Sequence, residues 1–162
     1  MTAGLLHAAG RFLQARCFGE EFKRLWIQRT GGRASLRTPT AGQEFMQFRA
    51  DYTHLGDLMF SHWEVPMAIR ALVRQQVQPA SAEAPARVPT LLLYVATQAA
   101  QAALQPEEDQ LERVLERPMV QYRLDTLAES AEVPVHTITQ VLHTRNQEIR
   151  AFAMSAVNAL RN

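Results

Sequence analysis

Histidine is the side chain of this sequence best suited to hold a metal ion, and the chain contains 5 histidines. His54 and His62 lie two helical turns apart, whereas a His-Glu-x-x-His clamp places its ligands one turn apart. His7 stands beside Ala8, which has no ligand atom. We therefore expect His54 and His62 to be partly exposed polar residues, and His7 to be hydrogen-bonded to backbone or to a neighbour.

The sequence contains no motif typical of nucleophilic catalysis or of phosphate binding. The sequence contains neither a Gly-x-Gly-x-x-Gly fingerprint nor a P-loop. None of five serines has a nucleophile-elbow sequence around it: Ser35, Ser61, Ser81, Ser130 and Ser155. Cys17 is the only cysteine, which excludes an intrachain disulfide and fits a reducing cytoplasm. We expect Cys17 to be a half-buried packing residue.

The composition is that of a globular protein rich in helix. Apolar residues make up 47% of the 162 and charged residues 20%, and glycine is limited to 7. The net charge of +1 gives no bulk reason to expect nucleic acid, a membrane surface or an acidic substrate. No apolar run approaches the ~20 residues of a membrane helix, and we expect no secretory signal. These features predict a cytoplasmic all-α protein without a cofactor.

The elements that must position any site are two short helices between Asp51 and Gln76. A stop is predicted at Glu64-Val65-Pro66, because the residue before a proline avoids the α region, and Pro66 suits the first turn of the next helix. Helical spacing predicts an apolar face on the first helix at Leu55, Leu58, Met59 and His62. It predicts a second stripe at Ile69, Leu72 and Val73.

This stretch resembles the HDOD family, a signalling branch of the HD phosphohydrolases. The family pattern has an Asp-His pair, a later Gly, a bulky run, a Trp, an x-Pro corner and a helix ending in His-His. The matching residues here are Asp51-Tyr52, Gly56, Leu58-Met59, Trp63, Val65-Pro66, Ile69 and Gln75-Gln76. Upstream, residues 4–11 resemble the family's Gly-Leu-Leu-His-Asp-Ile-Gly-Lys turn with Ala8 replacing the Asp, and Glu44 matches an acidic residue before the Asp-His pair.

The resemblance implies a domain whose metal site has been lost. The parent enzymes hold an ion with His and Asp ligands and use it to activate water against phosphorus. The corresponding positions here are His7, Ala8, Asp51, Tyr52, Gln75 and Gln76, and phenol and amide groups are poor ligands for such ions. The resemblance therefore predicts no bound metal and no catalytic residue. It implies a signalling module of bacteria that acts through protein–protein contact, with Trp63, Pro66 and Gly56 in its structural core.

Over residues 1–162 we expect one HD/HDOD-like domain, an irregular bundle of about eight helices. Before the two central helices, helices are predicted at 3–16, 18–30 and 41–50. A surface linker is predicted at 77–89, followed by helices at 90–104 and 106–117. The region 119–162 is predicted to form a helical hairpin and a further helix, because Val135 to Leu142 and Ile149 to Leu160 give separate apolar stripes. We find no internal repeat.

A complete HDOD domain has several helices before the one predicted at 3–16. The resemblance thus implies the C-terminal part of such a domain, or a shortened relative. Leu5, Leu6 and Phe12 would pack on those earlier helices. We therefore expect these residues to contact a second copy of the chain or another protein.

A different class of function is suggested by residues 124–143, which resemble the helix-turn-helix of lactose-repressor-type regulators. In that interpretation His136, Thr137 and Gln140 would face a DNA major groove. Two features oppose it. Glu132 stands at the turn position usually held by glycine, where a positive φ is strained. The acidic and basic residues of the segment balance, so attraction to phosphate is weak. A packed helical hairpin is the other interpretation.

Overall fold

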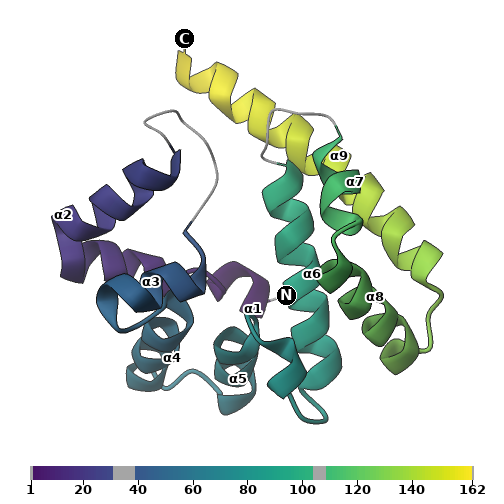
Figure 1. Cartoon of the computed structure of the whole chain (residues 1–162), viewed down its shortest axis with the longest axis horizontal. Helices are drawn as coiled ribbons and strands as arrows, with labels where there is room; N and C mark the ends of the chain where they lie inside the picture. Colours follow the sequence, from purple (N-terminus) through teal and green to yellow (C-terminus); the bar gives the residue numbers. More distant parts are fainter. Residues whose placement is uncertain (1, 31–38, 104–108, 162) are drawn as a thin grey trace. The chain divides into compact units, whose positions relative to one another are not determined.

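The computed structural model describes residues 2–30, 39–103 and 109–161 (Figure 1). Within these ranges the chain forms helices and no strand, so the predicted all-α class is confirmed. The chain divides into two compact units, Met1–Leu93 and Tyr94–Asn162, and the single domain stays a prediction. No helix of the described ranges is both long and apolar enough to cross a membrane.

The first unit is built around α4, which packs against α2 and α5. Helix α1 also packs on α5, and α3 on α4. The bounds are α1 Thr2–Leu6, α2 Gly10–Thr30, α3 Ala41–Phe48, α4 Tyr52–His62 and α5 Met67–Gln75. A short 3-10 turn, η1, follows at Pro79–Ser81, and α6, Arg87–Ala103, begins in this unit and ends in the second.

Side-chain caps explain where α3 and α4 begin. The Thr40 hydroxyl accepts from Gln43 N at 3.3 Å, and Thr40 N donates to the Gln43 side chain at 3.0 Å, which makes a capping box. Asp51 Oδ1 accepts from Thr53 N at 2.8 Å and from His54 N at 3.1 Å. Such caps satisfy backbone donors that the first turn of a helix leaves without partners.

The helix predicted at 3–16 is interrupted, and this corrects the sequence analysis. Helix α1 ends at Leu6 and α2 begins at Gly10. In a continuous helix the His7 carbonyl would accept from Arg11 N, but Arg11 N donates to Ala8 O at 3.0 Å. The His7 carbonyl instead accepts from Gln76 Nε2 at 2.7 Å. The apolar stripe predicted for one helix is thus divided between two.

Helix α2 is continuous where a break was predicted between residues 16 and 18, and it kinks instead at Gly19, whose φ is 42°. On either side of the kink, Phe18 stacks on Phe48 with ring centroids 4.5 Å apart, and Phe22 lies 6.4 Å from the same ring. These contacts hold the middle of α2 on the end of α3. Cys17 is exposed, so the expected half-buried packing role is wrong.

The corner between α4 and α5 lies where the sequence predicted it, but different residues fill the core. Trp63 is 62% exposed and Pro66 is also exposed, which corrects their assignment to the core. Phe60, which is 0% exposed, is the buried aromatic residue of this corner instead of Trp63. The centroids of the two rings lie 6.1 Å apart. Gly56 is buried, as predicted.

The buried face of α4 is also rotated from the predicted one. It consists of Tyr52, Thr53, Gly56 and Phe60, while Leu58 is 65% exposed. The predicted face was chosen from the large apolar residues of the helix. In the structure Gly56, the smallest residue of α4, packs against α2. On α5, Val73 is fully buried, in agreement with the predicted stripe.

The predicted surface linker at 77–89 is partly wrong. Pro79 and Ala82 are buried, η1 lies inside it, and α6 begins at Arg87 within it. Helix α6 buries Leu91, Val95, Ala99 and Ala102, as predicted, but Leu92 is 52% exposed.

The second unit contains the end of α6 together with α7, α8 and α9. Their bounds are Gln110–Leu115, Pro118–Ala131 and Val135–Arg161. Helix α8 packs against α7 and α9, and Asn146 of α9 donates from Nδ2 to the Ala99 carbonyl at 3.2 Å. The buried core includes Leu111, Val114, Val120, Leu124, Leu127 and Leu142.

One helix, α9, replaces the two predicted between Val135 and Leu160. The sequence between the two apolar stripes, His143 to Glu148, contains neither Gly nor Pro, so nothing in it stops a helix. The side chains of Phe152 and the residues after it lie outside the described part of the structure.

Candidate functional site

A polar cluster in the first unit surrounds Glu44, which is 0% exposed. Its Oε1 lies 3.1 Å from Arg11 Nε, and its Oε2 accepts from Gln14 Nε2 at 3.2 Å and from Tyr52 N at 2.9 Å. We call Glu44, Arg11, Gln14 and Tyr52 the Glu44 cluster. It joins α2, α3 and the first turn of α4 through one carboxylate.

Two further contacts fix Arg11. Its Nη2 donates to the Pro39 carbonyl at 3.1 Å, and its guanidinium carbon lies 4.1 Å from the centroid of the Tyr52 ring. A cation over an aromatic face is attracted by the ring electrons. Arg11 therefore pairs with Glu44 while covering the Tyr52 ring.

Asp51 stands next to the cluster and caps α4. Its Oδ1 accepts from the Thr53 hydroxyl at 2.6 Å as well as from backbone, and its Oδ2 lies 2.9 Å from His54 Nδ1. The carboxylate is thus engaged by the first turn of its own helix. His54 is exposed, as the sequence predicted, and so is His62.

Burial raises the pKa of Glu44 above its usual 4.5, although Arg11 and the Tyr52 N–H oppose the rise. Burial also acts to raise the pKa of Asp51, but hydrogen bonds from Thr53 and His54 outweigh it and lower that pKa below 3.8. The Tyr52 phenol has its pKa raised to about 12, mainly by burial. Burial thus acts in the same direction on all three groups, and only for Asp51 do hydrogen bonds outweigh it.

Two glycines set the distance between α2 and α4. A methyl group at Gly10 would stand 1.9 Å from the Tyr52 carbonyl oxygen and 2.7 Å from Gly56 N. A methyl group at Gly56 would lie 3.6 Å from Gly10 N and 3.4 Å from the Val73 side chain. The two backbones are in direct contact at this crossing, which leaves no space for a ligand between them.

Residues that the sequence analysis matched to HDOD ligand positions lie near the turn between α1 and α2. Gln76 reaches His7 O from α5, and Tyr52 touches Gly10 from α4. His7 Nδ1 lies 2.7 Å from Gly4 O, the backbone partner expected for this histidine. Ala8 adds no polar group, and Gln75 and Gln76 each have a buried Oε1 without a hydrogen-bond partner.

In the described ranges, no group of three or more His, Cys, Asp or Glu residues could hold an ion. Glu44 has its oxygens occupied by protein donors and is closed to solvent, so it cannot reach a substrate. The cluster can fasten three helices together.

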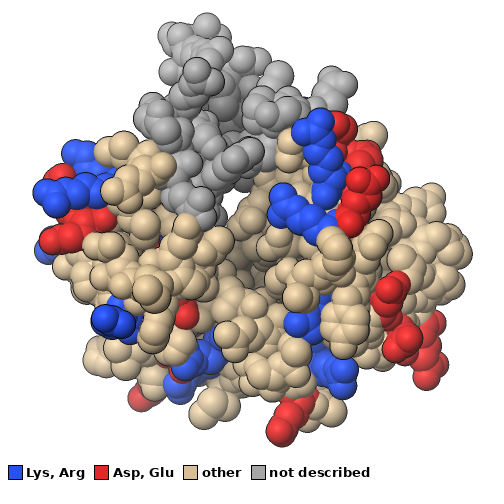
Figure 2. All heavy atoms as spheres, viewed as in Figure 1, with Lys and Arg blue, Asp and Glu red and all other residues tan. Residues whose placement is uncertain are grey.

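The second set of predicted site residues lies at the start of α9. His136, Thr137 and Gln140 are all exposed there, and they share the first two turns of the helix. Glu132 adopts the positive φ of 54° that a helix-turn-helix places at its turn. Figure 2 shows acidic side chains gathered over the end of α8 and the corner, where Asp125, Glu129 and Glu132 are exposed. This charge repels a phosphate backbone.

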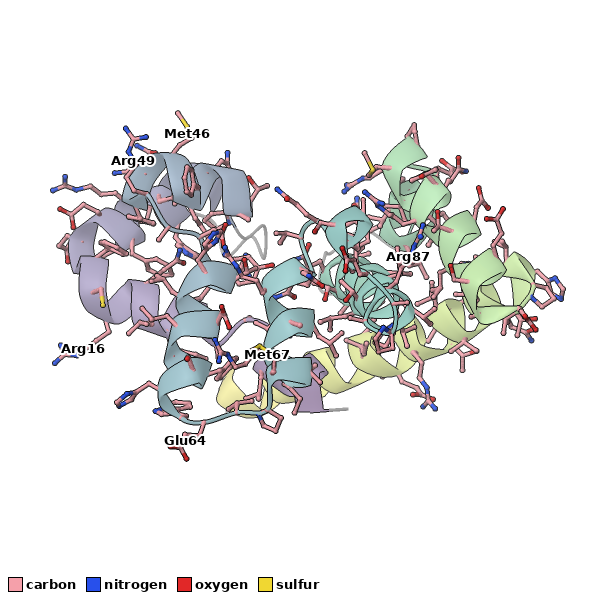
Figure 3. The ribbon with its side chains drawn as sticks, turned by 90° about the horizontal axis from the view of Figure 1, so that it is seen from below. Arg16, Met46, Arg49, Glu64, Met67 and Arg87 are labelled. Carbon is pink, nitrogen blue, oxygen red and sulfur yellow. The ribbon has the colours of Figure 1, made fainter. Side chains whose placement is uncertain are left out.

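A corner of the same sequence joins two helices of the first unit. The sequence analysis found no internal repeat and did not note that the two corners are alike. Glu64-Val65-Pro66 and Glu132-Val133-Pro134 both follow a helix, and both glutamates have a φ of 54°. Val65 N donates to Phe60 O at 2.9 Å, and Val133 N donates to Ala128 O at 3.0 Å. Figure 3 shows Glu64 pointing away from both of its helices. The corner is thus a way of joining helices and does not by itself indicate DNA binding.

Sequence reasoning identified Glu44 from the family pattern but missed its partners. Arg11 entered the sequence analysis only as the last residue of the 4–11 match and Gln14 carried no motif, because both reach Glu44 only when α2 and α3 are adjacent.

No protein-family model matches the chain, and no curated protein or solved structure matches it either.

Proposed function

We propose that the chain is a non-catalytic HDOD-type module of bacterial signal transduction that acts through contact with other proteins. The observation that carries the proposal is the hydrogen bond from Gln76 Nε2 to His7 O. It joins two positions at which the HDOD pattern has metal ligands. In this chain a direct polar contact links elements that an ion would link in the parent enzymes.

The orientation of the Gln76 amide follows from its neighbours. Its nitrogen faces two carbonyl oxygens, His7 O at 2.7 Å and Val73 O at 3.0 Å. Carbonyls only accept, so the amide must present its N–H₂ group to them. A donor in this place repels a cation, which supports loss of the ion together with loss of the ligands.

The proposed contact surface includes Phe12, which is 81% exposed on α2. Leu6 is half-buried on α1, and the Leu5 side chain lies outside the described part of the structure. An aromatic ring left this open gains free energy when a partner covers it. We propose that a second copy of the chain or another protein does so.

Two measurements test the proposal. Elemental analysis of untagged protein should find no stoichiometric iron, manganese or zinc, and added Mn²⁺ should give no hydrolysis of a phosphodiester substrate. Metal that is retained at one equivalent and lost in His7→Ala would overturn the non-catalytic assignment.

Association is tested by light scattering over a dilution series. Phe12→Glu should lower the measured mass of any oligomer, while Leu58→Glu, at another exposed apolar residue, should leave it unchanged. If both variants match the wild type at every concentration, Phe12 is not a self-association surface.

A helix-turn-helix regulator is a second candidate, favoured by the exposure of His136, Thr137 and Gln140 and by the shape of the corner. The acidic surface beside it weighs against this function. Fluorescence anisotropy with mixed duplexes at low salt should show weak, non-selective binding. A sequence-selective complex abolished by Gln140→Ala would reverse the order of the two proposals.

A further inference from the structure

A groove in the second unit combines an apolar floor with a polar, acidic rim. It has a volume of about 420 Å³ and lies among α7, α8 and α9. The apolar side chains are Leu115, Leu124 and Val135. The polar side chains are Glu116, Gln121, Asp125 and Thr139.

The helices explain the shape of the groove. Gln121 and Asp125 are one turn apart on α8, and Val135 and Thr139 are one turn apart on α9. Each pair therefore lies along one side of its helix, and the packing of α8 on α9 sets the two pairs in facing walls. Glu116 comes from the end of α7, which packs against α8.

The charge of the rim is not neutralised within the protein. Glu116 and Asp125 are exposed and take part in none of the ion pairs of the described residues. Two basic groups of the unit are paired with other carboxylates: Arg113 lies 2.6 Å from Asp109, and Arg145 lies 2.6 Å from Glu148. The Arg123 guanidinium lies against the Tyr122 ring, 5.3 Å from its centroid. A guanidinium or ammonium group entering the groove would meet two carboxylates that form no ion pair with the described residues.

We propose that this groove binds a short segment of a protein partner in which an arginine or lysine is flanked by aliphatic side chains. Its volume falls in the range of roughly 300–1,000 Å³ usual for binding pockets. The aliphatic side chains would cover Leu115, Leu124 and Val135, and the cation would lie between Glu116 and Asp125. The Gln121 amide can accept from and donate to the peptide backbone. The inference concerns the second unit and does not depend on the HDOD-type assignment.

The probe is the blocked tripeptide acetyl-Leu-Arg-Leu-amide, titrated into the ¹⁵N-labelled full chain. Saturable shifts should centre on the amides of Leu124, Val135 and Thr139. Affinity should fall as salt rises, because exposed charge pairs are screened. The same peptide with citrulline in place of arginine keeps the shape and loses the charge. Its affinity should therefore be lower by about fivefold or more.

Variants of the chain separate this site from general charge attraction. Asp125→Asn and Glu116→Gln should each weaken the arginine peptide about fivefold, because each removes one exposed charge pair. Glu129→Gln changes an exposed carboxylate of α8 that is outside the groove, and should leave the affinity unchanged. Equal binding of the citrulline peptide, equal effects of all three variants, shifts away from the groove, or no saturable shift would each overturn the proposal.

Discussion

Gly10 and Tyr52 touch through their backbones: a methyl group at Gly10 would stand 1.9 Å from the Tyr52 carbonyl oxygen. This contact sets the approach of α2 to α4, and with it the positions of Arg11 and Gln14 around Glu44. The backbone atoms at the contact cannot rotate away as a flexible side chain could. The crossing therefore requires glycine.

Gly10→Ala should destabilise the protein by about 3 kcal/mol or more, because overpacking here must displace one of two helices. Gly42→Ala is the matched control, since the nearest atom to its added methyl group, Thr40 Oγ1, is 4.0 Å away. That variant should gain roughly 0.5–1 kcal/mol from helix propensity. Urea unfolding measures both, and a Gly10→Ala loss below about 1 kcal/mol would show that the helices can separate freely.

Glu44→Gln should lower the free energy of unfolding by about 3 kcal/mol, because an amide cannot accept from Arg11, Gln14 and Tyr52 N together. Glu21→Gln, an exposed change on α2, should have little effect. Urea unfolding at fixed pH compares them. A Glu44→Gln protein as stable as the wild type would mean that the cluster does not hold the three helices.

The direction of the Glu44 pKa shift determines how stability should change with pH. Burial raises this pKa above 4.5, so the folded protein holds the proton more tightly than the unfolded chain. The contribution of Glu44 is therefore greatest below 4.5 and declines as pH rises through the raised folded pKa. Asp51 acts oppositely and below 3.8, where its stabilising contribution is lost as pH falls through its lowered folded pKa.

Unfolding experiments at a series of pH values from about 4.5 upward isolate Glu44, because the Asp51 window lies below this range. The difference in unfolding free energy between wild type and Glu44→Gln should shrink as pH rises. A difference that grows with pH would indicate that the folded protein lowers the Glu44 pKa.

Phe60→Ala should cost about 3–5 kcal/mol, whereas Trp63→Ala should cost less than about 1.5 kcal/mol. Phe60 is 0% exposed and Trp63 is 62% exposed, so only the first change opens a cavity. Denaturant unfolding of both variants checks the order. The reverse order would restore Trp63 as the core residue of the corner.

Much of the helical framework could be predicted because proline, glycine and caps act locally. The Val65-Pro66 corner follows from the backbone preference of the residue before a proline. The kink at Gly19 was not predicted, although glycine permits its positive φ. The join between the two apolar stripes of α9 was missed for the opposite reason. A change of apolar pattern was interpreted as a helix end, although no residue there stops a helix.

The polar site could be predicted only in part. Glu44 was found from the spacing of the HDOD pattern, but its role depends on Arg11 and Gln14, which are about thirty residues away in the sequence. The burial of Phe60 instead of Trp63 depends on how α4 rotates to place Gly56 against α2. That rotation is set by contact between distant segments, which residue spacing within one helix does not contain.

The central claim is that His7, Ala8, Tyr52, Gln75 and Gln76 occupy the positions of a lost metal site. Restoring the ligands tests it most directly, in a variant that combines Ala8→Asp, Tyr52→His, Gln75→His and Gln76→His. Isothermal titration with Mn²⁺ or Zn²⁺ should show no specific binding to the wild type and about one equivalent to the restored variant. Adding His7→Ala should abolish that binding. A folded restored variant that binds no metal, or whose metal binding is indifferent to His7→Ala, would contradict the claim.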